Sequence, residues 1–399
     1  MACPGAWKSW TRRWHSKMET KAGDPGAFAR FDLTRVPSPA FVVDEAAIRR
    51  NLEVLADVKA RSGAKILLAL KAFSMWSLAP VIDEYLDGCC ASGLWEARLA
   101  ARHFKGSIST YSPAYKKTDL EEIATLSEHI IFNNPAQINR WKDQITKEIG
   151  LRLNPEIALG ETPKYDPSQP HSRLGFPVSQ LQASHFDDLY GIHFHNLCEQ
   201  NFRELEQTWK KIEPVIAPHF DKLKWINLGG GHHITREDYD RDALVRFLSD
   251  LKARSGCEIY LEPGEAVALD AGILVGELLD IFDNGMPVAI TDISATCHMP
   301  DVIEAPYRPA MLGERSDGGP IRLGGPSCLA GDIIGDYRLP EPPHIGQRIA
   351  FLDQAHYSMV KTNTFNGVPL PSIWLWNSET DDLRCVKQFD WTEFRDRLS

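Results

Sequence analysis

The sequence predicts an α/β protein in which a closed (β/α)₈ TIM barrel is followed by a β-rich domain. Eight short β-prone runs succeed one another between residues 64 and 264. Amphipathic segments separate many of them, with apolar residues at three- and four-residue spacing, as in LWEARLAARHF and DALVRFLSDLKARSG. After about residue 270 this helical pattern nearly vanishes, and runs of Val, Ile and Thr are interrupted by Gly and Pro.

The eight runs are apolar on both faces, which is typical of a parallel sheet covered by helices. In chain order they are AKILLAL (64–70), DGCCAS (87–92), GSISTYS (106–112), EHIIFNN (128–134), IGLRLNP (149–155), LYGIHFH (189–195), LKWINLGG (223–230) and CEIYLEPG (257–264). One unbroken series of eight favours a closed barrel. An open, doubly wound sheet is the alternative.

These patterns divide the chain into three parts. Residues 1–36 are expected to form a poorly ordered extension, and residues 37–270 the barrel. Residues 271–399 are expected to form a barrel- or sandwich-like β domain, for which residues 36–44 are a candidate first strand.

Composition excludes several classes of protein. The formal net charge of −10 argues against nucleic-acid binding and suits a small cationic substrate. No apolar run is long enough to span a membrane, and no secretory signal is evident. The eight cysteines show no CxxC pair or zinc-ligand spacing, so we expect reduced thiols in the cytoplasm and no metal.

The first run is followed by Lys71, a lysine where the apolar pattern calls for another Leu or Val. In these barrels, functional side chains stand at the carboxyl ends of the strands. A partly desolvated amine there has a lowered pKa and can attack a carbonyl. The alternative is an ordinary surface lysine that ends the strand.

The sixth run ends with two histidines on one face, His193 and His195. A metal pair would need a third ligand, and none has an obvious spacing. The other interpretation is that His195, nearer the strand end, packs its flat imidazole against a flat ring.

The last two runs end in a glycine triplet and an acid. Gly229, Gly230 and Gly231 would expose backbone N–H groups to a phosphate, at a place where barrels commonly bind one. Glu262 could pair with a pyridinium nitrogen. A plain turn and a solvated glutamate are the alternatives, but amine, flat imidazole, phosphate cradle and carboxylate together indicate one site.

From about Pro37 to the C-terminus the sequence resembles the fold-type III pyridoxal-phosphate decarboxylases, which join an alanine-racemase-like barrel to a β domain. The matching segments are LALKAFS, GIHFHN, NLGGG, LEPGE, GGPSCLAGD and HYSMVKTNTFNG. The resemblance implies pyridoxal 5′-phosphate as cofactor. It assigns to the cofactor Lys71 as the covalent link, His195 as the stacking ring, Gly229, Gly230, Gly231 and Tyr357 as phosphate contacts, and Glu262 as the partner of the ring nitrogen.

Within that superfamily, CASGLWEARLA, LRLNPE, SRLGF, TDISATCHMPDVIEAPYRP and GGPSCLAGDIIGDY are similar to the enzymes that decarboxylate carboxynorspermidine and carboxyspermidine. This implies polyamine biosynthesis and a homodimer with shared sites, in which Cys328 would supply the proton that replaces CO₂. Glu265 stands where ornithine decarboxylases often have an arginine, and Leu329 where they have an acid. The residues that this likeness offers for the polyamine ammonium groups are Glu265, Asp292, Asp301 and Asp332.

Other functions fit the same fold. A decarboxylase for diaminopimelate or an arginine-like diamino acid is one, although the missing arginine after EPG counts against a second substrate carboxylate. A non-catalytic carrier of pyridoxal phosphate is another, and a Schiff-base aldolase without the cofactor is a third.

Overall fold

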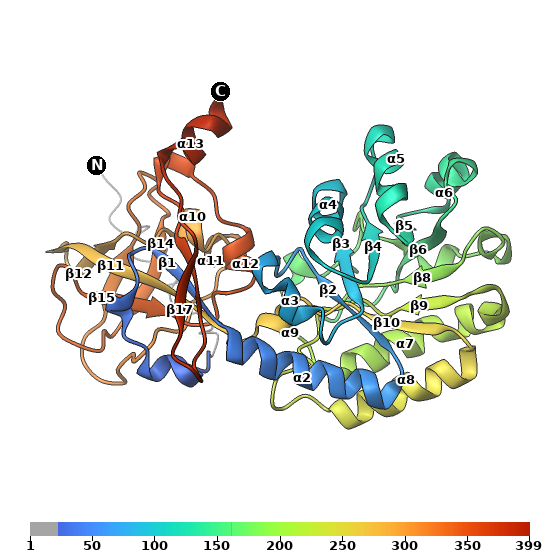
Figure 1. Cartoon of the computed structure of the whole chain (residues 1–399), viewed down its shortest axis with the longest axis horizontal. Helices are drawn as coiled ribbons and strands as arrows, with labels where there is room; N and C mark the ends of the chain where they lie inside the picture. Colours follow the sequence, from blue (N-terminus) through green and yellow to red (C-terminus); the bar gives the residue numbers. More distant parts are fainter. Residues whose placement is uncertain (1–22, 161) are drawn as a thin grey trace, which may run out of the picture. The chain divides into compact units, whose positions relative to one another are not determined.

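A computed structural model describes residues 23–160 and 162–399. The chain divides into two compact units (Figure 1). The barrel unit is Ala47–Leu269, and the β unit combines the residues up to Ala46 with Asp270–Ser399.

The barrel unit contains the predicted closed sheet. Neighbouring strands run parallel in the order β5-β4-β3-β2-β10-β9-β8-β6-β7, and pairing of β5 with β6 closes the ring. All eight predicted runs are strands of this sheet, and a two-residue strand, β7, is added at β6. The strands are β2 (Lys65–Ala69), β3 (Gly88–Ala91), β4 (Ser107–Tyr111), β5 (His129–Phe132), β6 (Glu148–Asn154), β7 (Phe176–Pro177), β8 (Gly191–His193), β9 (Trp225–Asn227) and β10 (Glu258–Leu261).

Helices surround this sheet (Figure 1), and α8 shows capping at both of its ends. The Asp240 side chain accepts the N–H of Ala243 at the start of α8, and Gly256 ends that helix with a φ of 69°. The α-helices are α2 (Glu45–Ser62), α3 (Ala79–Ile82), α4 (Leu94–His103), α5 (Lys117–Leu126), α6 (Pro135–Trp141), α7 (Phe202–Ile216), α8 (Arg241–Ser255) and α9 (Glu265–Ala268). Between β6 and β8 the chain forms short 3₁₀ turns, η5 (Pro163–Tyr165), η6 (Val178–Gln180) and η7 (Ala183–Phe186).

Trp225, at the first position of β9, fills the barrel interior near the start of the strands. Its ring takes the space that side chains would occupy on two neighbouring strands, because a Cβ on Gly191 would lie 2.0 Å from it and one on Gly150 2.3 Å. Leu67, Ile131 and Tyr260 complete this buried cluster. The interior is therefore closed at this end, and the strands' carboxyl ends are left for the polar side chains.

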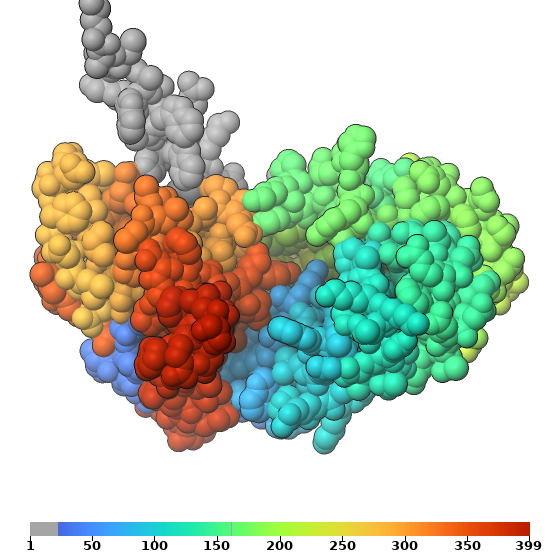
Figure 2. All heavy atoms as spheres, turned by 90° about the horizontal axis from the view of Figure 1, so that it is seen from above, coloured from blue at the N-terminus to red at the C-terminus, as the bar shows by residue number. Residues whose placement is uncertain are grey.

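The β unit is built on an eight-stranded mixed sheet with the order β14-β13-β12-β11-β1-β16-β17, and β15 pairs with β11. Its strands are β1 (Ala40–Asp44), β11 (Gly272–Asp283), β12 (Pro287–Thr291), β13 (Ile321–Gly324), β14 (Ile333–Tyr337), β15 (Arg348–Phe351), β16 (Ser372–Trp376) and β17 (Leu383–Lys387). Its helices are α10 (Ala295–His298), α11 (Asp301–Glu304), α12 (Tyr357–Val360) and α13 (Trp391–Leu398). The side chains of α13 remain largely exposed on the surface of the unit (Figure 2).

The first boundary lies later than the predicted residue 37. β1 pairs antiparallel with β11 and parallel with β16, so residues 40–44 belong to the β unit. All five residues of β1 are buried, as expected of a strand between two others. The barrel unit accordingly begins at Ala47.

The expectation of a poorly ordered extension through residue 36 is wrong for its described part, and residues 1–22 lie outside the described residues. The 3₁₀ helices η1 (Gly26–Arg30) and η2 (Leu33–Arg35) pack on β16. Phe28 and Phe31 are buried against Trp376, with ring centroids 5.3 and 4.9 Å from its ring.

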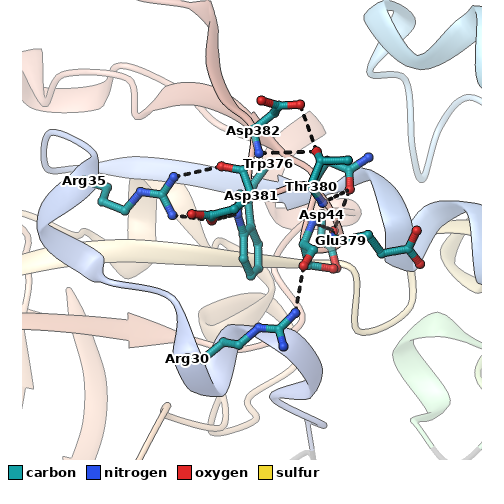
Figure 3. Close-up of polar contacts among 10 residues, drawn as sticks. Arg30, Arg35, Asp44, Trp376, Glu379, Thr380, Asp381 and Asp382 are labelled. Carbon is teal, nitrogen blue, oxygen red and sulfur yellow. Dashed lines mark hydrogen bonds and ion pairs between the residues drawn. The ribbon is translucent and has the colours of Figure 1, made fainter.

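Figure 3 shows the polar contacts around this aromatic cluster. Arg30 donates to the carbonyl of Ser378 at 2.7 Å, and Arg35 binds the carboxylate of Asp381 at 2.6 Å. The buried carboxylate of Asp44 accepts the N–H and the hydroxyl of Ser378. The segment before β1 is thus held by hydrogen bonds to the turn between β16 and β17.

Candidate functional site

Lys71 lies two residues beyond the end of β2. Its turn is anchored to both neighbouring strand ends, because Ala69 donates its N–H to the carbonyl of Pro263 at 2.9 Å and Leu70 donates to Cys90 at 3.2 Å. Leu70 and Ala72 are buried, whereas Lys71 is exposed. The lysine in the apolar run therefore occupies the open position of an otherwise buried turn.

The amine of Lys71 is close to the barrel's polar side chains, and Nζ lies 3.1 Å from Nε2 of His195. Although the residue is exposed to solvent, protein atoms surround the amine itself. This desolvation lowers the pKa of Lys71, and the charge of Arg152 lowers it further. The amine consequently has a larger neutral fraction than a surface lysine, which is the form that attacks a carbonyl.

His195 stands two residues beyond β8, and one tautomer explains both of its contacts. Nδ1 accepts the N–H of Gly230 at 2.9 Å, so the proton of the neutral ring resides on Nε2. Nε2–H then points to the lone pair of Lys71 Nζ. Burial lowers the pKa of His195 well below its ordinary value, and the charges of Lys71 and Arg152 add to this. The imidazole is therefore a neutral, oriented, flat ring.

Arg152, on β6, is a site residue that the sequence interpretation missed. Its guanidinium donates to the carbonyl of His195 at 2.8 Å and lies over the Tyr111 ring, 4.4 Å from the centroid. It is buried, so its charge acts through a medium that screens it little. LRLNPE reads only as a strand with an arginine among apolar residues, and nothing in the local pattern shows that the arginine contacts a tyrosine from another strand.

Glu262 directly follows β10 and is buried. Its two oxygens have different partners: Oε1 accepts the side-chain N–H of Asn227 at 2.7 Å, and Oε2 lies 3.2 Å from Nε2 of His193. Burial by itself would raise the pKa of Glu262, but the contacts with His193 and Asn227 outweigh it and the pKa is lowered. The residue is thus an ionised carboxylate inside the barrel, able to hold a protonated ring nitrogen.

The glycine triplet has left-handed backbone at Gly229 and Gly231, with φ of 68° and 83°. Two of its amides already have acceptors: Gly229 donates to Asn227 Oδ1 at 2.9 Å, and Gly230 donates to His195. Only the amide of Gly231 has no acceptor among the described residues. Of the three glycines predicted to bind phosphate, Gly231 is therefore the best placed.

Glu265, at the first position of α9, stands at the same end of the barrel. Its carboxylate lies 3.4 Å from Nε2 of His233, which lies two residues after Gly231. Both side chains are largely buried. Position 265 thus carries an acid that already faces an imidazole, where ornithine decarboxylases often have an arginine.

In the β unit, Cys328 lies between β13 and β14 and is exposed. Its N–H donates to Oδ1 of Asn366 at 2.8 Å, and Asn366 has left-handed backbone with a φ of 60°. Its neighbour Leu329 is also exposed, at 44%. The thiol is therefore presented on a surface of this unit.

Asp332 differs from the other predicted substrate-binding acids because its carboxylate is buried and fully engaged. It accepts both the hydroxyl of Ser294, at 2.9 and 3.0 Å, and that of Ser327, at 2.6 Å. The N–H of Thr296 donates to it at 3.1 Å. These bonds order the loop that carries Cys328, so a direct contact of Asp332 with substrate would require breaking them.

The remaining predicted residues of the β unit also have partners. Asp292 accepts the hydroxyl of Ser38 at 2.5 Å, and burial raises the pKa of its carboxyl group. Asp301 pairs with Lys361 at 2.5 Å. Tyr357 begins α12 and is partly buried. Within the barrel unit, by contrast, the structure brings together Lys71, His195, Glu262 and the glycine loop, which is the triplet Gly229–Gly231.

Known proteins are similar to the chain over most of its length. The family model for the pyridoxal-dependent decarboxylase C-terminal sheet domain matches residues 40–355. The carboxynorspermidine/carboxyspermidine decarboxylase of Campylobacter jejuni subsp. jejuni is 38% identical, over 90% of this chain and 98% of that protein. The carboxyaminopropylagmatine decarboxylase of a Synechocystis species is 37% identical, over 92% of this chain and 96% of that protein.

A solved structure agrees with these likenesses. The crystal structure of carboxynorspermidine decarboxylase from Campylobacter jejuni, complexed with norspermidine, superposes with a TM-score of 0.85 at 38% identity. The match covers 91% of this chain and 100% of the Campylobacter chain.

Proposed function

Because the chain belongs to the pyridoxal-dependent decarboxylases, we propose that it converts carboxynorspermidine and carboxyspermidine to norspermidine and spermidine. The observation that carries this proposal is the 38% identity to the Campylobacter enzyme over nearly its whole length. The same likeness argues against a carrier without catalysis and against an aldolase. The acidic balance of the chain, with a net charge of −10, suits a polycationic substrate.

The barrel residues fit pyridoxal phosphate. The cofactor, when bound, supplies an electron-withdrawing ring that accepts the electron pair of the bond to the departing carboxyl group. Lys71 offers a partly neutral amine for its aldehyde, and Glu262 an ionised carboxylate for its ring nitrogen. Gly231 offers an amide for its phosphate, and we propose that Tyr357 adds a phenol there.

Each residue then has a distinct task. Lys71 would hold the aldehyde of the bound cofactor through its amine, and His195 would present to the cofactor ring a neutral flat face held by Gly230. Glu262 keeps the ring nitrogen protonated, which its lowered pKa permits through the neutral range. Cys328 donates a proton to the carbon that has lost CO₂.

The acids of the chain would hold the ammonium groups of the polyamine. Glu265 is the strongest of the four candidates because it stands at the same barrel end as Lys71. Asp292 and Asp301 accept bonds from Ser38 and Lys361, so a substrate ammonium would share or replace those partners. We assign Asp332 the supporting task of ordering the Cys328 loop.

We further propose a homodimer in which Cys328 of one copy completes the site of the other. The exposed thiol and the exposed Leu329 beside it support this arrangement. The test mixes Lys71→Ala and Cys328→Ala subunits, which are each inactive in a shared site. Random exchange should restore about a quarter of wild-type activity, since only one site of each mixed dimer is intact. Activity that stays at the level of the single variants contradicts the shared site.

Two observations bear on where the protein works. Among the described residues, no helix has the length and apolarity needed to cross a membrane. The seven described cysteines are all free thiols. The free thiols support our proposal of a reducing compartment, the cytoplasm.

The substrate proposal is tested by CO₂ release from four acids assayed side by side. These are carboxynorspermidine, carboxyspermidine, carboxyaminopropylagmatine and diaminopimelate, with Lys71→Ala as the blank. We expect the highest kcat/KM for the first two. A preference for carboxyaminopropylagmatine, the substrate in the name of the Synechocystis relative, or for diaminopimelate would overturn it.

A further inference from the structure

Asn227 links the glycine loop to the carboxylate of Glu262. It is the last residue of β9 and is fully buried. Oδ1 accepts the N–H of Gly229 at 2.9 Å, while Nδ2 donates to Oε1 of Glu262 at 2.7 Å. A carboxamide accepts only at its oxygen and donates only at its nitrogen, so these two partners together determine its orientation.

The backbone closes this link into a ring. Glu262 donates its own N–H to the carbonyl of Gly229 at 2.8 Å, so Gly229 both accepts from position 262 and donates to Asn227. A Cβ on Gly230 would lie 2.0 Å from the carbonyl oxygen of Glu262, which shows how tightly the loop sits on the end of β10. The loop therefore cannot shift without moving Glu262.

The next glycine extends the same connection to the lysine. Gly230 donates to Nδ1 of His195, whose Nε2 lies 3.1 Å from Lys71 Nζ. The loop thus reaches the carboxylate through Gly229 and Asn227, and the amine through Gly230 and His195. The amide of Gly231 remains for a phosphate.

We propose that Asn227 is a positioning residue that couples the phosphate end of the cofactor site to its ring-nitrogen end. This inference rests on the proposed use of pyridoxal phosphate. Asn227 orients Glu262 by a charge-assisted hydrogen bond and holds the glycine loop with its other end. Phosphate bound at the loop and a protonated nitrogen bound at Glu262 are then supported by one side chain.

The test changes the donor and the acceptor of the hydrogen bond between Asn227 and Glu262. Asn227→Asp keeps the acceptor for Gly229 but removes the donor to Glu262 and places two carboxylates together. We expect it to weaken pyridoxal phosphate binding by roughly ten- to a hundred-fold, measured by absorbance titration of the apoprotein. The double variant Asn227→Asp with Glu262→Gln restores a donor–acceptor pair with the opposite polarity. Its cofactor affinity should exceed that of Asn227→Asp, because two carboxylates no longer face each other, although it stays below wild type and turnover stays low because the charge at position 262 is lost.

Asn196→Ser is the matched control. Asn196 is a buried asparagine near the end of the neighbouring strand, but its amide donates to Thr208 on α7, away from the loop. We expect it to change cofactor affinity by less than the Asn227 variant. If Asn227→Asp does not fold, as judged by circular dichroism, Asn227→Ser replaces it and should again weaken binding more than Asn196→Ser.

The outcomes separate this inference from the proposed function. Wild-type cofactor affinity in the Asn227 variants, or a double variant that binds no better than Asn227→Asp, would overturn the coupling. A wild-type protein that takes up no pyridoxal phosphate would instead overturn the proposed function. No substrate enters the binding titration, so an error in the identity of the polyamine leaves this result unaffected.

Discussion

The guanidinium of Arg152 stacks on the ring of Tyr111 inside the barrel, 4.4 Å from its centroid. The Tyr111 hydroxyl is itself held by Asn133, to which it donates at 2.7 Å. This arrangement fixes a positive charge close to Lys71, where it disfavours the ammonium form. Arg152 thereby acts on the lysine through electrostatics, with burial as the larger cause of the lowered pKa.

Replacing Arg152 by Met should raise the pKa of Lys71, because one of the two main causes of its depression is removed. The neutral amine then becomes abundant only at higher pH, so the pH–rate profile for combination of the apoprotein with pyridoxal phosphate should move to higher pH. The measurement is the second-order rate from visible absorbance over a pH series.

Lys65→Met is the control for that experiment. Lys65 also forms a cation–π pair with a tyrosine of the barrel, Tyr260, at 5.5 Å, but at the start of β2 rather than beyond its end. Its removal should leave the profile in place. An Arg152→Met profile that coincides with wild type would show that the charge has no influence on the amine.

Lys71 should reduce the stability of the apoprotein. The pKa of Lys71 is lower in the folded state than in the unfolded chain. Between these two pKa values the unfolded chain therefore binds more protons than the folded protein, and folding becomes less favourable as the pH falls. The penalty is greatest at low pH and disappears as the pH rises through the ordinary pKa of lysine. Lys71→Met should therefore increase Tm more at pH 6 than at pH 10. Because the residue is exposed, we expect a gain of no more than about 1 kcal/mol. Equal gains at both pH values would contradict this cause.

The barrel strands could be predicted because each carries a local signal, an apolar run bounded by turn residues. Lys71 and Glu262 could be located for the same reason, since a charge at the end of an apolar run is conspicuous. Arg152 and Asn227 could not be located in this way, because their contacts are with residues from other strands. Arg152 contacts Tyr111, and Asn227 donates to Glu262.

The prediction that the segment before β1 is poorly ordered failed for a related reason. Phe28 and Phe31 show no helical or strand periodicity, and their burial depends on Trp376 near the other end of the sequence. Such a contact between distant residues leaves no trace in a local pattern. The partners of Asp332 are equally invisible in a local pattern: the likeness offered it as a substrate contact, and its carboxylate accepts hydrogen bonds from Ser294 and Ser327.

Phe31→Ala tests whether the segment before β1 stabilises the β unit. Phe31 is 6% exposed and packs edge-on against Trp376, so its truncation removes buried aromatic surface. We expect a loss of about 3 kcal/mol in the free energy of unfolding, measured by urea denaturation. Arg35→Ala breaks the neighbouring, solvent-accessible ion pair with Asp381 and should cost less than about 1 kcal/mol. Similar losses for both variants would mean that the aromatic cluster is not the main source of stability.

Cys328→Ala tests the proposed proton donor. If the thiol delivers the proton that replaces CO₂, its removal should lower kcat by roughly 10²–10⁴-fold, the usual contribution of a positioned acid. Cofactor absorbance should not change, because Cys328 is not needed to hold the ring. In D₂O, wild type should place deuterium in one stereochemical position of the product, whereas the variant should place it in both. Cys385→Ala, which removes another exposed thiol of the β unit, should keep wild-type kcat and stereochemistry. A Cys328→Ala enzyme with wild-type rate and a single deuterated product would require a different acid.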